Sequence, residues 1–161
     1  MRVGHWLFLV SAALFIVGIA FLVAGTRTID ERPAVEAVVT TPVASVQQIM
    51  RGIVAPAASV VFNSVGTTIT ASGTEERMPR TTEEWNAVGD SVAALAESGN
   101  LLMLDGRAID KGDWMTMSRA LMDGARVALK AIEAKNVEAL FGSGETINAS
   151  CDSCHQRYQR Q

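Results

Sequence analysis

Residues whose types and spacing suggest chemistry are concentrated in one five-residue segment. Cys151 and Cys154 are three positions apart, and His155 follows directly. On a helix, this spacing places both sulfurs on one face, at a separation that matches the edge of a porphyrin. C-x-x-C-H is the attachment signature of c-type haem, in which the thiols add to the vinyl groups and the histidine ligates the iron. We therefore predict one covalently attached haem c, held through thioethers by Cys151 and Cys154, with His155 as the proximal iron ligand.

Three other interpretations of the segment stay open as minor alternatives. A thioredoxin-type redox pair needs a preceding strand in a βαβ setting, and the sequence pattern shows neither. A zinc site needs four ligands, but the only other Cys or His in the chain is His5. The third alternative is a chance match. The sequence shows no paired carboxylates and no nucleophile with an adjacent base, so we expect a protein that is not an enzyme.

Length and composition limit the remaining possibilities. The chain has 161 residues, 48% of them hydrophobic, and a formal charge of −3 from 14 basic and 17 acidic residues. This length predicts one globular domain. Two cysteines cannot build a disulfide framework, and a mildly acidic chain without a Lys/Arg block is not expected to bind nucleic acid.

The N-terminal region is strongly apolar. Trp6 to Ala24 is a run of 19 residues without a charge, which is long enough to cross a bilayer. Residues 1–25 are therefore predicted to be a transmembrane anchor. A cleaved signal stays as the alternative, although Leu22 and Ala24 form a poor cleavage pair. Arg2 favours a cytoplasmic N-terminus, which places the rest in the bacterial periplasm, either tethered to the inner membrane or soluble after cleavage.

The segment that follows is predicted to be a tether and then a helix. Residues 26–42 contain two prolines and mixed charge without a helical period, and we interpret them as the tether. From residue 43 to about 66, apolar residues recur every three or four positions, which predicts a helix. Its expected inner face comprises Val43, Val46, Met50, Ile53, Ala57 and Val60. Pro56 predicts a kink, and residues 67–80 are predicted to form a loop.

Three further helices are predicted after this loop. Thr81 and Glu84 have the spacing of a capping box, and the inner face of the helix that follows comprises Trp85, Val88, Val92, Leu95, Gly99 and Leu102. Asp113 is predicted to cap the next helix, whose inner face comprises Trp114, Met117, Leu121, Ala125, Ala128 and Ile132. The last helix begins near Asn136, and Gly142 and Gly144 either break it or make room beside it. Residues 43–161 are thus predicted to be an all-α, antiparallel four-helix bundle.

With C-x-x-C-H in its last helix, the predicted bundle resembles the cytochrome c′ family, the class II c-type cytochromes. Cys151 to Tyr158 is similar to the family's C-x-x-C-H-x-x-Y/F, and Gln48 to Arg51 is similar to the place where six-coordinate members supply a methionine. The resemblance implies that Met50 is the second axial ligand. Arg51 is a candidate propionate contact. Family members commonly carry an arginine four residues after the haem histidine, where this chain has Gln159.

Other thioethers compete with Met50, and the choice of ligand decides the function. Met117, Met122 and Met103 are the rivals, on or next to the second and third predicted helices. A Met/His ligand pair suits electron transfer, so we expect a membrane-tethered cytochrome that carries single electrons between redox partner proteins. Without Met50 as a ligand, the alternative is a five-coordinate haem that binds NO or CO. A fixed relay in a respiratory complex is a third expectation, and the resemblance leaves a homodimer open.

Overall fold

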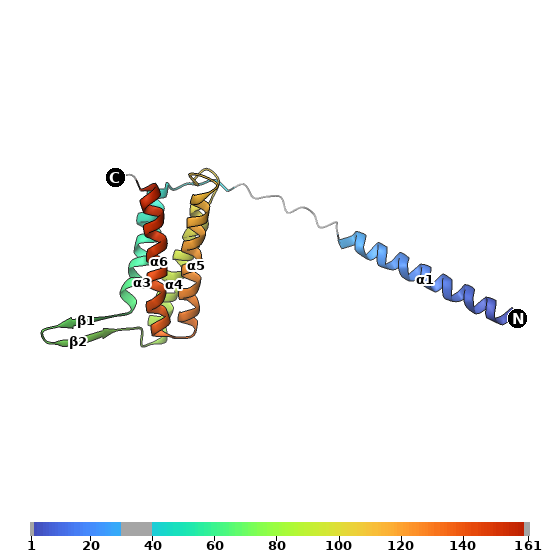
Figure 1. Cartoon of the computed structure of the whole chain (residues 1–161), viewed down its shortest axis with the longest axis horizontal. Coiled ribbons are helices and arrows are strands. Elements are labelled where there is room, and N and C mark those ends of the chain that lie inside the picture. Colours follow the sequence, from blue (N-terminus) through green and yellow to red (C-terminus); the bar gives the residue numbers. More distant parts are fainter. Residues whose placement is uncertain (1, 30–39, 160–161) are drawn as a thin grey trace. The chain divides into compact units, whose positions relative to one another are not determined.

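The computed structural model describes residues 2–29 and 40–159. The chain divides into two compact units, residues 1–39 and residues 40–161, which are considered separately. The protein is mostly helical, and its N-terminal unit contains one long apolar helix. Both units appear in Figure 1.

The N-terminal helix, α1, spans Arg2–Ile29. Its segment Gly4–Ala24 is long and apolar enough to cross a membrane, a test that signal sequences near an N-terminus also pass, and none of it is buried within the structure. The helix continues through Ile29, so residues 26–29 of the expected tether are helical. Residues 30–39 of the expected tether lie outside the described residues.

The second unit consists of helices and one hairpin. It contains α2 (Val46–Ile49), the π-helical turn η1 (Met50–Val54), α3 (Ala55–Ser64), β1 (Gly66–Thr70), β2 (Gly73–Arg77), α4 (Thr82–Leu102), α5 (Asp113–Glu133) and α6 (Val137–Tyr158). In Figure 1, α3, α4, α5 and α6 lie side by side, and each runs opposite to the one before it. Their buried side chains form one hydrophobic core.

The sequence pattern predicted α4 correctly. Every residue of its expected inner face is buried. Its capping box is also present: the Glu84 amide donates to Thr81 Oγ1 over 3.2 Å, and the Thr81 amide donates to Glu84 Oε2 over 3.0 Å. Gly99 permits the close approach of α5, because a Cβ there would overlap the side chain of Met122.

The inner face of the first helical segment differs from the prediction. Val43 is 97% exposed and Val60 is 42% exposed, so neither belongs to the core. The buried residues are Ile49, Val54, Ala57, Ala58, Val61 and Val65. Val43 lies before α2 begins and is not part of a helix. For Val60 the cause is η1, which adds one residue to the turn and moves the apolar face by one position after it. The irregularity expected at Pro56 thus takes the form of a π-helical turn just before that residue.

The predicted loop at residues 67–80 is largely a two-stranded antiparallel hairpin, so the expectation of a domain without strands is wrong. The strands pair from Gly66 with Arg77 to Thr70 with Gly73. All of β2 and most of β1 are exposed. Since no face of the hairpin is buried, its sequence carries no alternation of apolar and polar residues by which strands are recognised.

The predicted N-terminal cap is wrong for α5 and correct for α6. Asp113 is the first residue of α5 and not its cap; the backbone cap is Gly112. Asn136 caps α6, where its side chain accepts from the Ala139 amide. Gly142 and Gly144 do not break α6, which runs without interruption to Tyr158.

Candidate haem-binding site

A groove between the first helical segment and α6 collects all the predicted site residues. Met50 and Arg51 line it from η1, and Cys151, Cys154 and His155 line it from α6. The groove has a volume of about 710 Å³. It is completed by Val46, Gln47, Val54, Ala55, Ala58, Ile109, Trp114, Tyr158 and Gln159. The structure therefore brings together five residues that the sequence separates by about 100 positions.

A second, smaller cavity distinguishes Met50 from the rival methionines. This cavity of about 30 Å³ shares Met50, Cys151, Cys154 and His155 with the groove, and it is also lined by Met117. Met122 is buried against Gly99 and lines neither space, and Met103 lines neither as well. Of the four thioethers, only Met50 lines both the groove and the small cavity.

The two thiols are half-buried. Burial raises the pKa of Cys151 and of Cys154 above the ordinary value for a thiol, so both are neutral thiols at neutral pH. The cysteine of a redox-active C-x-x-C pair has a lowered pKa instead. His155, at the surface of α6, is exposed and can be reached from the groove.

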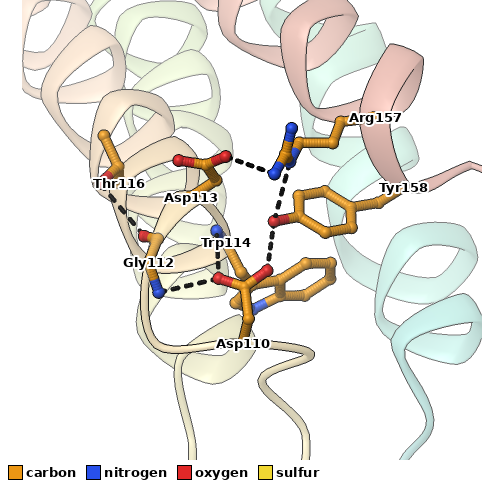
Figure 2. A network of polar contacts seen from close by, with 7 residues as sticks. All are labelled: Asp110, Gly112, Asp113, Trp114, Thr116, Arg157 and Tyr158. Atoms are coloured by element: carbon orange, nitrogen blue, oxygen red, sulfur yellow. Dashed lines mark hydrogen bonds and ion pairs between the residues drawn. The ribbon is translucent and has the colours of Figure 1, made fainter.

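A network of polar contacts joins the last turn of α6 to the start of α5 (Figure 2). The Tyr158 hydroxyl donates to one carboxylate oxygen of Asp110. The other oxygen accepts from the amides of Gly112, over 2.8 Å, and Trp114, over 3.1 Å. Asp110 thus performs the side-chain capping role at α5 that the sequence had suggested for Asp113.

Asp113 instead pairs with α6. Its Oδ2 lies 2.6 Å from Nη2 of Arg157, whose guanidinium also lies 5.7 Å from the centre of the Tyr158 ring. The Tyr158 ring meets Trp114 edge-on, with 5.1 Å between ring centres. Tyr158 is three residues after His155, so these contacts hold the turn that carries the histidine (Figure 2).

The hydrogen bond between Tyr158 and Asp110 shifts the pKa of both side chains. The donated phenol proton lowers the pKa of Asp110, and the same bond raises the pKa of Tyr158. Asp110 is therefore ionised and Tyr158 protonated over the whole neutral range, which is the state in which this bond forms.

The start of the first helical segment is held by a residue between α4 and α5. Arg107 Nε donates to the Ala44 carbonyl over 3.1 Å, and its Nη1 donates to the Leu101 carbonyl. Ser45 then caps α2, with its hydroxyl accepting from the Gln48 amide over 3.2 Å. These bonds fix the segment that leads into Met50.

Gln47, Ile109 and Asp110 are among the residues of the site region that sequence reasoning missed. Gln47 and Ile109 line the groove without any recognisable motif. Asp110 had a local signal, since an Asp two residues before a glycine commonly accepts from the backbone of a turn. Its bond to Tyr158 spans 48 positions, and no local pattern indicates it.

Comparisons with protein-family models, curated proteins and solved structures found no match for this chain. Within residues 2–29 and 40–159, no group of three or more His, Cys, Asp or Glu side chains is arranged to hold a metal ion.

Proposed function

We propose that this chain is a membrane-associated c-type cytochrome, similar to cytochrome c′, that carries single electrons at the periplasmic face of the bacterial inner membrane. The supporting observation is the groove, in which Met50 from the first helical segment and the C-x-x-C-H residues from α6 line one space. In this proposal the four packed helical segments are the antiparallel four-helix bundle of that family.

The lining of the groove suits a haem. Its walls are largely apolar, with Val54, Ala58 and Trp114 among them, and polar Gln47, Arg51 and Gln159 also line it. Haem combines a flat apolar ring with two carboxylates, so the apolar walls suit the ring and the polar side chains suit the carboxylates. The volume of about 710 Å³ falls within the range of roughly 300–1,000 Å³ that is usual for cofactor pockets.

Each residue has a defined part in this proposal. Cys151 and Cys154 would hold the group covalently, and His155 would ligate its iron. Met50 would supply a thioether ligand, and Arg51 would pair with a propionate. A bound haem supplies one-electron redox chemistry, and a Met/His ligand pair raises its potential. Val54 and Trp114 give the groove apolar walls, while the bond between Asp110 and Tyr158 holds the turn that carries His155 in place.

The α1 helix determines where the protein works. As an uncleaved anchor, Gly4–Ala24 keeps the cytochrome beside membrane-bound redox partners; as a cleaved signal, it leaves a soluble periplasmic carrier. Mass measurement of the mature chain separates the two outcomes, because cleavage removes the segment.

The test is production of the full chain together with the cytochrome c maturation machinery, followed by detergent extraction. Haem that stays attached after denaturation is the first expected result. Absorption spectra are then recorded in both oxidation states, and CO is added to the reduced form. We expect a low-spin spectrum with a weak thioether-to-iron band, unchanged by CO.

Met50→Ala is expected to remove the thioether band and permit CO binding, whereas the matched variant Met103→Ala leaves both unchanged. A protein without covalent haem would overturn the cytochrome proposal. A high-spin spectrum that shifts at once with CO would replace electron transfer with the binding of NO or CO. A stable partner in the detergent extract would indicate a fixed relay in a larger complex, and a doubled mass of the purified protein would indicate a homodimer.

A further inference from the structure

The buried positions of the first helical segment contain one irregular step. Ile49 and Val54 are both buried, and they are five residues apart. After Val54 the buried positions Ala57, Ala58 and Val61 return to steps of three and four. A step of five does not occur on one face of an α-helix, where neighbours are three or four apart. The extra residue lies in η1, in which the Ala55 amide bonds to the Met50 carbonyl five residues earlier.

This extra residue decides which side chain lines the small cavity beside the C-x-x-C-H residues, where Met50 lies and Arg51 does not. An α-helix turns by about 100° per residue. If residues 46–64 formed an uninterrupted α-helix with α3 packed as it is, everything before η1 would be rotated by that angle. Met50, four residues before Val54, would then enter the core. Arg51, three residues before Val54, would take the place from which Met50 now lines the small cavity.

Two residues make this the favoured place for the extra residue. Pro56 has no amide hydrogen, so the Gly52 carbonyl has no α-helical donor, and the proline ring also crowds that carbonyl. Gly52 itself is exposed, has no atom within 4 Å of a Cβ built on it, and has low helix propensity. On both sides of η1 the helix is held in place: Ile49 is buried before it, and Ala57 and Val61 are buried after it.

We propose that η1 is a positioning element, in which Gly52 and Pro56 accommodate one extra residue and thereby place the thioether of Met50, and not the guanidinium of Arg51, in the small cavity that the C-x-x-C-H residues line. The inference rests on the proposed function where it concerns iron ligation. The register itself does not depend on haem.

The test uses a matched deletion and insertion in the full chain. Deletion of Gly52 removes the extra residue and lets η1 become α-helical without rotating Met50 relative to Val54. Insertion of one Ala after Gly52, with η1 retained, places Met50 five residues before Val54, which is the buried place that Ile49 holds now. In the holoprotein, the deletion variant should keep the Met50-dependent thioether band, and the insertion variant should lose it and bind CO. Circular dichroism and covalent haem content show that each variant is folded and loaded.

A second measurement needs no haem. The chain produced without the maturation machinery is treated with hydrogen peroxide, and oxidation of each methionine is followed by peptide mass spectrometry, with the half-buried Met78 as the internal reference. We expect Met50 to oxidise about fivefold more slowly in the insertion variant, because it is then buried, and at an unchanged rate in the deletion variant. If wild-type protein takes no haem, the proposed function fails while this measurement still tests the register.

The inference is overturned if the folded deletion variant loses the thioether band or oxidises faster at Met50. It is equally overturned if the folded insertion variant keeps the band and the wild-type oxidation rate, because η1 would then have no control over which side chain lines the small cavity.

Discussion

The two ends of the helical domain are held together by different kinds of contact. At the groove end, side-chain hydrogen bonds join distant parts of the chain, from Arg107 to the Ala44 carbonyl and from Tyr158 to Asp110. At the hairpin end, the helices meet through buried apolar side chains such as Trp85 and Leu140. A groove keeps α6 apart from the first helical segment, so apolar contact cannot join them there. Polar bonds instead join each of them to the connection between α4 and α5, the first segment through Arg107 and α6 through Asp110.

The difference between the ends is tested most strongly by removing the thiols. Cys151→Ser combined with Cys154→Ser is expected to abolish covalent haem completely, because serine hydroxyls do not add to the vinyl groups. The matched control is Phe141→Ser, an exposed residue at the hairpin end of the same helix, which should keep the wild-type haem content. Mass spectrometry of the denatured protein measures both, and a haem adduct on the double variant would contradict the assignment.

The next largest effect is a loss of stability expected at Trp114, with the buried Trp85 at the other end of the domain as its control. Trp114 is 2% exposed, and its Nε1 donates to the Leu102 carbonyl over 2.8 Å. Trp114→Phe leaves this buried carbonyl unpaired and should lower the free energy of unfolding by about 1–3 kcal/mol beyond the loss of ring size. Trp85→Phe is the control at the other end, since no hydrogen bond from its indole is found among the described residues. Urea denaturation compares the two, and equal losses would show that the bond contributes nothing.

A smaller, pH-dependent loss is expected for Asp110→Asn. The pKa of Asp110 is lowered in the folded protein because Tyr158 donates to it, so its stabilising contribution is fully present above the ordinary carboxyl pKa. That contribution disappears as the pH falls through the lowered value. Melting temperatures of wild type and variant should therefore differ at pH 7 and converge in acid. Asp90→Asn, an exposed carboxylate on α4, is the control, and a constant difference at all pH values would contradict the role of the ionised form.

The smallest effect is expected in the hairpin. Ile69 is 81% exposed on β1, so Ile69→Thr removes almost no buried surface and keeps a β-branched residue in the strand. The free energy of unfolding should change by no more than about 0.5 kcal/mol, and the haem spectrum should stay the same. A larger loss of stability would mean that the hairpin packs on the helices more tightly than its exposure indicates.

The sequence predicted those parts of the fold that depend on local periodicity. The inner face of α4 and its Thr81–Glu84 capping box are confirmed, because a single regular helix carries both signals. The hairpin was missed because an exposed sheet needs no apolar alternation. Val60 was assigned to the wrong face because the extra residue in η1 is required by packing on both sides of it, which a count along the sequence does not reveal.

The residues of the candidate site likewise include some that the sequence indicated and some that it did not. Cys151, Cys154 and His155 form a contiguous motif, and Met50 was suggested by a family resemblance; that these residues share a groove is now observed, while their role as haem ligands stays a prediction. Asp110 was missed because its partner, Tyr158, belongs to another helix.

The short connections between α4, α5 and α6 have a consequence for folding kinetics. Residues 103–112 and 134–136 are all that separate these helices, so their mutual contacts are local in sequence and close at little entropic cost. The first helical segment instead packs mainly on α4 across the longer connection of residues 65–81, and its contact with α6 closes a loop of nearly the whole domain. We expect the three-helix part to form first and the first segment to dock last. Until that docking, the groove lacks one wall, and Cys151 and Cys154 stay open to the enzymes that would attach haem.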